Sequence, residues 1–220
     1  MRGIAVASGL IGTCYVVDDD EAFRGSLLAL LTSGGYSCQG FASAIAFLEH
    51  AATLAPGVLL LDLRLPQLTG LDLIESHGPV LQRFAVVMIS GHGDIGRAVR
   101  SIKAGALDFI EKPFASEELL TLVHAANHIL SRRASQSAAR HEALTKIATL
   151  SPREAEVLRL LLAGAPNKIV ARTLDLSVRT VEMHRANMLA KLGARSTAEA
   201  IHMAMIGNVE PWPLPSDLRY

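Results

Sequence analysis

The sequence predicts two domains: an α/β domain with a doubly wound parallel sheet, and a smaller all-α domain. Over roughly the first 130 residues, short apolar runs alternate with amphipathic stretches of helical spacing, a pattern typical of a parallel sheet covered by helices. From Ser151 onward the pattern is purely helical. Half of the 220 residues are hydrophobic and 19% are charged, so we expect packed cores rather than disorder.

Five apolar runs are expected to form the strands of the first domain, over residues 13–18, 36–41, 57–62, 84–90 and 107–110. The run Val58-Leu59-Leu60-Leu61 is apolar throughout, as expected for a central strand covered on both faces. After the first strand, apolar residues follow helical spacing at Phe23, Leu27, Leu30 and Leu31. Gly34-Gly35 marks the end of this helix. A helix over roughly 116–131 is expected to close the domain.

Three segments lie outside the two domains. Residues 1–12 are expected to be a leader; Arg2 and the apolar stretch before Cys14 faintly suggest a signal peptide, but cleavage there would strip the first strand of its lead-in. Residues 131–147 lack glycine and predict a polar, helical linker. Residues 208–220 carry three prolines and predict a loose tail, in which Trp212 could dock locally.

Composition favours a cytoplasmic protein. The two cysteines, Cys14 and Cys38, are too few for a disulfide framework and have no metal-ligand spacing, so we expect both to be thiols in a reducing compartment. No apolar run reaches the roughly 18 residues that span a bilayer, and we expect no membrane partner.

Net charge is zero overall but uneven. Residues 1–130 hold 8 Lys/Arg against 13 Asp/Glu, and residues 131–220 hold 13 against 8. This split favours an acidic module for cation or phosphate chemistry, joined to a mildly basic module for nucleic acid.

Polar side chains follow four of the predicted strands. The carboxyl ends of parallel strands meet at one edge of a sheet, so Asp18, Asp19, Asp62, Ser90 and Lys112 are expected to gather there. Three carboxylates are hard oxygen ligands suited to Mg²⁺. Asp is also a covalent phosphoryl acceptor, which makes Asp62 a candidate nucleophile. Lys112 and the Ser90 hydroxyl would then pair with phosphoryl oxygens.

Four segments together resemble the receiver domain of two-component response regulators, most closely the FixJ-type branch: VVDDDEAFR, LLLDLRLPQLTG, VVMISGHGD and AGALDFIEKPF. The resemblance covers about residues 13–130 and implies a flavodoxin-like, five-stranded parallel sheet of order 2-1-3-4-5. It implies that Asp62 becomes a 4-aspartylphosphate, with Ser90 and Lys112 beside it. It also implies a Mg²⁺ site formed by Asp18, Asp19, Asp62 and the backbone carbonyl of Arg64. A two-residue switch is implied as well, formed by Ser90 and Phe109.

Departures from that family pattern are small. Position 90 is Ser where many relatives have Thr, which keeps the hydroxyl but loses the methyl group that stiffens the side chain. Phe109 lacks a hydroxyl, and Leu65 replaces the commoner Met. His92 is expected to be exposed in the loop after the fourth strand. The stretch 93–106 contains three glycines, so its helix should be weakly self-stabilised, as a switch element should be.

The second half predicts a helix-turn-helix. NKIVARTL and SVRTVEMHRANMLAKLG form helices around the short turn LDLS, with Ser177 as a cap, and SPREAEVLRLLLAG and STAEAIHMAMIG form two more. With Val181 at the centre of the buried face, the opposite face could meet base edges, and it carries Arg179, Glu182, Met183 and Ala186. A polar flank suited to phosphates or a partner subunit carries Thr180, His184, Asn187 and Lys191. Arg185 falls towards the core, with its head expected to snorkel.

Residues 148–207 resemble the LuxR-type DNA-binding domain through SPREAEVLRLLLAG, PNK, RTVEMHRANMLAKL and ARSTAEA. The resemblance adds Lys168, in PNK, to the candidate DNA contacts. Ile169 departs from it, because relatives usually carry a polar residue there; we expect either a small contact surface or an isolated exposed side chain.

The two resemblances together imply a response-regulator transcription factor. A sensor histidine kinase would phosphorylate Asp62, and a homodimer would then bind promoter DNA and act on RNA polymerase, without enzymatic turnover. Two alternatives stay open: DNA binding independent of phosphorylation, and a Mg²⁺-dependent phosphatase that uses Asp62 as nucleophile. Arg64 disfavours the phosphatase, because a general acid is expected at that position.

Overall fold

The computed structural model describes residues 10–91 and 95–214. The chain divides into two compact units, one ending at Arg133 and the other beginning at Ala134. Most of the predicted leader and the predicted exposed His92 lie outside the described residues. Within the described ranges, no helix has both the length and the apolar character needed to cross a membrane.

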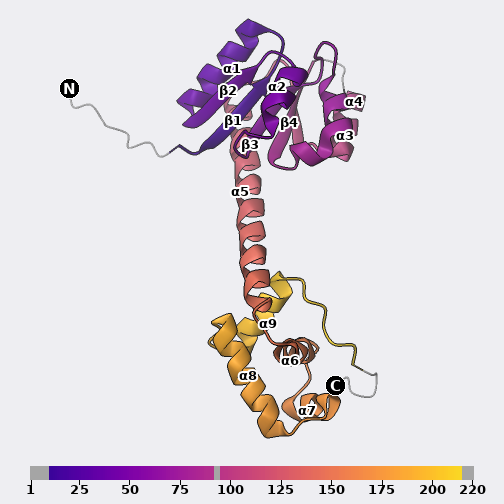
Figure 1. Ribbon diagram of the computed structural model, residues 1–220. Helices are drawn as coiled ribbons and strands as arrows, with labels where there is room; N and C mark the ends of the chain where they lie inside the picture. The colour runs from indigo at the N-terminus through magenta and orange to yellow at the C-terminus, as the bar shows by residue number, and fades with distance from the viewer. Residues whose placement is uncertain (1–9, 92–94, 215–220) are drawn as a thin grey trace, which may run out of the picture. The chain divides into compact units, whose positions relative to one another are not determined.

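The first unit is built on a five-stranded parallel sheet of order β2-β1-β3-β4-β5, as expected (Figure 1). The strands are β1 (Gly12–Val17), β2 (Tyr36–Phe41), β3 (Gly57–Asp62), β4 (Phe84–Ser90) and β5 (Asp108–Glu111). The predictions for β1 and β5 were each wrong by one residue. The paired register of β1 with β2 ends at Val17, although the Asp18 N–H still donates to the Phe41 carbonyl at 3.2 Å, and β5 starts at Asp108, which pairs with Val87.

Helices cover both faces of this sheet, which is why its central strands are apolar throughout. One face carries α1 (Glu21–Ser33) and the first part of α5, packed around buried side chains that include Leu27, Leu31, Leu119 and Val123. The other face carries α2 (Ala44–Ala51) and α3 (Gly70–Leu81), packed around Phe47 and Leu73. Helix α4 (Ile95–Ala104) lies beside α3 (Figure 1).

Helix α5 runs without a break from Ser116 to Ile147. The predicted closing helix and the predicted helical linker are therefore one element. Residues 131–147 contain no glycine or proline to interrupt it, and they are exposed over most of their length.

The second unit packs the end of α5 with α6 (Pro152–Leu162), α7 (Asn167–Leu174), α8 (Val178–Leu192) and α9 (Thr197–Ile206). Ser151 and Glu154 form a capping box at the start of α6. Ser177 caps α8, and Gly193 ends it in the left-handed conformation with φ 65°. These local signals place α7 and α8 as a helix-turn-helix, as predicted.

One prediction for the second unit is wrong: Ile169 is buried in the helical core rather than exposed, because α7 packs that face against the neighbouring helices. The local docking considered for Trp212 is present: its N–H donates to the Arg159 carbonyl at 3.0 Å, and Leu214 is buried, so residues 208–214 are not loose. The Arg159 Nε in turn donates to the Glu210 carbonyl at 3.0 Å. Apolar side chains of this segment cover α6, which the proline content alone did not indicate.

Candidate functional site

Three carboxylates meet at the carboxyl edge of the sheet. Asp62 ends β3 and Asp18 follows β1, which pairs with β3; these side chains are almost fully buried, at 7% and 1% exposure. Asp19 is exposed beside them. One oxygen from each carboxylate lies within 4.8 Å of the others. The edge predicted from the strand order is therefore acidic, and two of its three charges are withdrawn from water.

The acidic run at 18–21 divides into two parts that lie in different surroundings. Asp18 and Asp19 belong to the carboxylate cluster. Asp20 instead caps α1: its side chain accepts the N–H groups of Ala22 at 2.9 Å and Phe23 at 3.0 Å. Glu21 lies in the first turn, where the helix dipole favours negative charge.

Lys112 supplies positive charge to this edge. It follows β5, and its Nζ lies 3.0 Å from Asp18 Oδ2 and 3.4 Å from Asp62 Oδ1. The ammonium also sits over the Phe23 ring, 3.9 Å from the centroid, which holds it towards the carboxylates. The residue predicted to pair with a phosphoryl group is thus placed beside the predicted acceptor.

The pKa of Asp62 is raised, first by burial and also by the nearby Asp18 carboxylate. Lys112 and a hydrogen bond from the Arg64 backbone N–H oppose that rise without cancelling it. The site therefore still lacks positive charge, and hard carboxylate oxygens in a compact group are donors that suit Mg²⁺. Asp18, Asp19 and Asp62 fit that ion; the Arg64 carbonyl remains a prediction.

Ser90 and Phe109 occupy the neighbouring strands β4 and β5. Ser90 is 2% exposed at the end of β4, and its hydroxyl donates to the Ile110 carbonyl at 3.5 Å, a long hydrogen bond. Phe109 points outward with 36% of its surface exposed. It borders a hollow of about 470 Å³ between β5 and α5. The hydroxyl is thus near the site, while the aromatic ring lies on the surface.

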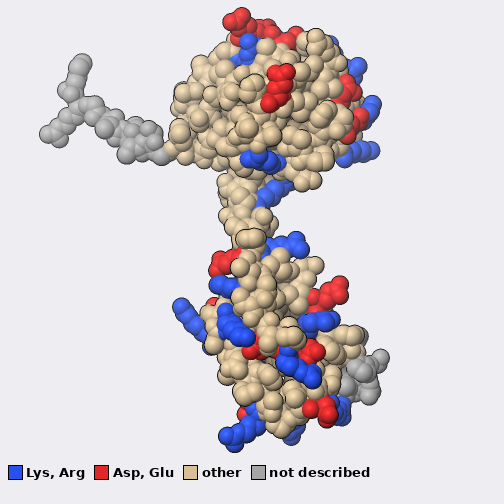
Figure 2. All heavy atoms as spheres, viewed as in Figure 1, with Lys and Arg blue, Asp and Glu red and all other residues tan. Residues whose placement is uncertain are grey.

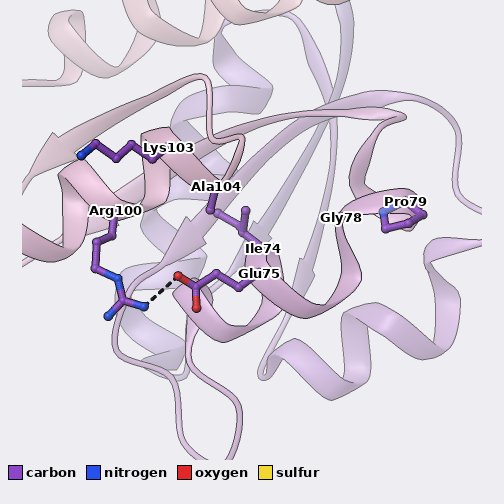
Figure 3. Close-up of a pocket in the computed structure, with 7 residues that line it drawn as sticks. All are labelled: Ile74, Glu75, Gly78, Pro79, Arg100, Lys103 and Ala104. Atoms are coloured by element: carbon purple, nitrogen blue, oxygen red, sulfur yellow. Dashed lines mark hydrogen bonds and ion pairs between the residues drawn. The ribbon is translucent and has the colours of Figure 1, made fainter.

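A second hollow, of about 540 Å³, lies between α3 and α4 (Figure 3). Arg100 of α4 reaches across it to Glu75 of α3, with 2.8 Å between Nη2 and Oε1. Helix α3 is kinked at His77 (φ −122°, ψ 25°), ahead of Pro79. Sequence reasoning missed this arrangement, although a proline inside a helical pattern is a signal for the kink. The ion pair between Arg100 and Glu75 therefore links the exposed side of α4 to α3.

Helix α8 presents the faces predicted from its sequence. Val181, Met188 and Leu192 are fully buried. The opposite face is exposed, Met183 by 52%, and includes Arg179, Glu182 and Ala186. Among the other candidate DNA contacts, the half-buried side chains are Thr180 and His184. The exposed ones are Asn187, Lys191 and Lys168. Lys and Arg side chains are spread over the visible face of this unit (Figure 2).

Some polar side chains of α8 already have partners inside the unit. Lys191 Nζ lies 2.7 Å from the buried carboxylate of Glu154, so its assignment to DNA stays a prediction with a competing partner. The prediction that the guanidinium of Arg185 extends towards solvent is wrong. Its guanidinium is held by side chains at the starts of two other helices, α7 and α9.

Comparison with known proteins covers both units. Residues 14–124 match the response regulator receiver domain family, and residues 148–204 match the bacterial regulatory proteins of the luxR family. The transcriptional regulatory protein FixJ of Rhizobium meliloti (strain 1021) is 40% identical over 200 residues, covering 90% of this chain and 98% of the relative. The response regulator protein TodT of Pseudomonas putida is 37% identical over 201 residues, with coverages of 91% and 88%.

Solved structures agree with this assignment. Full-length FixJ from B. japonicum is 38% identical with a TM-score of 0.59, covering 91% of this chain and 98% of that one. The response regulator StyR is 35% identical with a TM-score of 0.75, covering 88% and 98%. With both units matched in order, the chain belongs to the FixJ-type response regulators, transcription regulators that join a receiver domain to a LuxR-type DNA-binding domain.

Proposed function

We propose that Asp62 accepts a phosphoryl group from a sensor histidine kinase, and that this phosphorylation controls dimerisation and sequence-specific promoter binding. The observation that carries the proposal is the position of Lys112, 3.4 Å from Asp62 inside a cluster of three carboxylates. A buried carboxylate with an ammonium and further acids around it is costly for stability alone, and such sites are more often functional.

In the transfer step, a carboxylate oxygen of Asp62 attacks the phosphorus of a phosphohistidine. The new P–O bond forms as the P–N bond breaks, and the electron pair leaves with the imidazole, which takes up a proton. Lys112 attracts the phosphoryl oxygens as a point charge. When bound by Asp18, Asp19, Asp62 and the Arg64 carbonyl, Mg²⁺ would supply the remaining neutralising charge. Water later hydrolyses the acyl phosphate, so the chain is a phosphoprotein that can dephosphorylate itself rather than a turnover enzyme.

Phosphorylation would reach the surface through Ser90 and Phe109. The phosphate adds roughly −1.5 to −2 charges near pH 7, and the Ser90 hydroxyl would donate to it in place of the Ile110 carbonyl. The long 3.5 Å bond to Ile110 makes that exchange inexpensive. As Ser90 moves inward, Phe109 gains space to turn inward, and the surface from α4 to β5 changes.

That surface is suited to a homodimer. Val99 and Ile102 of α4 are exposed by 45% and 40%, close in sequence to the exposed Phe109 of β5. A dimer would align two DNA-binding units on two half-sites. Moving such a switch from mostly off to mostly on takes about 5.5 kcal/mol of differential stabilisation, which phosphate contacts and dimer contacts would share.

In the DNA complex, the exposed face of α8 would meet base edges in the major groove. That face carries Arg179, Glu182, Met183 and Ala186. Phosphate contacts are assigned to Lys168, Thr180, His184, Asn187 and Lys191. The bound dimer would then act on RNA polymerase.

The test compares the full-length wild type with Asp62→Asn and with Asp20→Asn, a matched control because Asn also caps helices well. Each protein is treated with Mg²⁺ and acetyl phosphate. A phosphate-affinity gel measures phosphorylation, sedimentation measures dimerisation, and binding is measured on a duplex that the treated wild type selects from random sequences.

Wild type and Asp20→Asn should be phosphorylated, dimerise and bind the duplex more tightly, and Asp62→Asn should do none of these. A response of Asp62→Asn equal to wild type would refute the proposal. Equal DNA binding by wild type with and without acetyl phosphate would favour the alternative of phosphorylation-independent binding.

A further inference from the structure

Arg185 joins three helices of the second unit. It lies on α8, and its Nη1 donates to Asn167 Oδ1 at 2.6 Å while its Nη2 donates to Thr197 Oγ1 at 2.6 Å. Asn167 is the first residue of α7 and Thr197 is the first residue of α9. One side chain therefore ties α8 to the starts of both neighbouring helices.

Both acceptors are available because neither caps its own helix. The N-cap of α7 is Pro166, which makes no side-chain cap bond, and the N-cap of α9 is Ser196. Both acceptors are also neutral, and the buried Nε of Arg185 has no hydrogen-bond partner among the described residues. Arg185 is half-buried, and the cost of its unpartnered Nε offsets part of what the two hydrogen bonds contribute to stability.

We infer that Arg185 is a positioning residue for DNA binding, fixing the first turn of α7 relative to the exposed face of α8. This inference rests on the proposed function of the second unit. Lys168, a candidate phosphate contact, follows Asn167 directly, whereas Arg179 and Met183 lie on the base-facing side of α8. Both sets must reach one duplex at the same time, so their relative placement limits affinity.

The planar fork of arginine is what serves this role. Two donors on one rigid group reach acceptors on two helices at once, whereas the lysine ammonium is a compact point charge on a flexible stem. Arg185→Lys keeps the charge and removes the bridge. It therefore separates positioning from simple attraction to phosphate.

The experiment uses the full chain, treated with Mg²⁺ and acetyl phosphate, and a duplex that the treated wild type selects from random sequences. Affinity is measured as a function of salt for wild type, Arg185→Lys, and Arg153→Lys as control. Arg153 pairs with Glu156 on the exposed side of α6. Urea unfolding of the second unit is followed in parallel. The same substitution is repeated in a background carrying Asn167→Ala and Thr197→Val.

We expect Arg185→Lys to bind about tenfold more weakly, within the range of coupling found in shared hydrogen-bond networks. The salt slope should match wild type, since no phosphate contact is lost. In the doubly substituted background, Arg185→Lys should have little further effect. Arg153→Lys should leave affinity unchanged.

Two results would overturn the inference. One is unchanged affinity of folded Arg185→Lys, as expected if only the charge attracts phosphate, and the other is an undiminished loss in the doubly substituted background. If wild type selects no duplex, the proposed function fails, and hydrogen exchange decides the positioning role. Arg185→Lys should then speed exchange of the α7 amides but not those in the middle of α8; equal rates in α7 would overturn it.

Discussion

Replacing Lys112 with methionine tests the charge balance at the carboxyl edge of the sheet. Its Nζ lies 3.0 Å from Asp18 and 3.4 Å from Asp62, and each attraction has a gross value of about 5 kcal/mol at an effective dielectric constant of about 20. Desolvation of the charges offsets most of this. The side chain of Lys112 is 30% exposed, so water screens part of the remainder.

The substitution leaves two nearly buried carboxylates facing each other without their cation. Removing one partner of a buried pair costs about 3–5 kcal/mol, and with the partial exposure of Lys112 we expect a loss of about 3 kcal/mol in the free energy of unfolding of the first unit. Mg²⁺ should restore part of that loss, since a dication replaces the missing ammonium. A ligand at 100 times its dissociation constant stabilises by about 2.7 kcal/mol.

Urea unfolding of the full chain, with and without Mg²⁺, measures both effects, and Lys103→Met on the exposed flank of α4 is the matched control. Stabilisation by Mg²⁺ should be larger in Lys112→Met than in wild type, and Lys103→Met should resemble wild type. A loss below about 1 kcal/mol, or equal Mg²⁺ stabilisation of both proteins, would refute the assigned charge balance.

Four further predictions address single residues. Asp62 has a raised pKa, so the folded state binds its proton more tightly than the unfolded chain, and its contribution to stability is lost as pH rises through the raised pKa. Asp62→Asn should therefore unfold at a higher urea concentration than wild type at pH 7. This advantage should vanish when the pH is below 3.8, the ordinary pKa of an aspartate side chain. A difference in urea midpoint that stays constant across pH would contradict this. Asp19→Ala should weaken Mg²⁺ binding, measured by calorimetry, whereas Asp20→Ala should not; the reverse order would reassign the two acids. Burial would raise the pKa of Glu154, but its ammonium and capping partners hold that pKa below 4.5, so its stabilisation is present above 4.5 and lost in acid. Glu154→Gln should destabilise the second unit by about 1 kcal/mol at pH 7, a value reduced because water screens the partly exposed Lys191. Thermal unfolding at pH 7 and at low pH measures this cost, and a cost that does not change with pH would show that the charge is unimportant. Ile169→Ala should destabilise the second unit by about 2–4 kcal/mol without changing unfolding of the first, and a cost under 0.5 kcal/mol would contradict its core position.

The carboxyl-edge site was predictable because its geometry follows from topology. Apolar runs define where strands end, and parallel strands in a doubly wound sheet end at one edge, so Asp18, Asp62 and Lys112 converge whatever their side-chain details. The capping bonds of Asp20 are equally local, since they extend over only three residues. The one-residue errors at β1 and β5 lie at strand ends, where the paired register stops and the apolar pattern does not mark that point.

The missed features depend on partners distant in sequence. The helical period places Arg185 towards the core, but its partners begin two other helices, 18 positions earlier and 12 positions later. Ile169 is buried because of how α7 packs, which periodicity over an eight-residue helix specifies poorly. Local docking of Trp212 was considered, but its partner Arg159 lies far away in sequence, and no local rule identifies that pairing.

The distribution of charge also explains why the first unit would respond to phosphorylation. Asp18, Asp19 and Asp62 outnumber the single ammonium of Lys112, so the resting site already carries unfavourable negative charge at an edge where β4 and β5 end. A phosphate on Asp62 increases that excess, and relief has to come from groups that can still move or donate. Ser90 has a hydroxyl held only by a long hydrogen bond, and it lies one strand from the outward-facing Phe109. The proposed signal therefore starts from excess negative charge around Asp62. This charge attracts the Ser90 hydroxyl, the least tightly held donor beside it, and the movement of Ser90 then changes the exposed surface of α4 and β5.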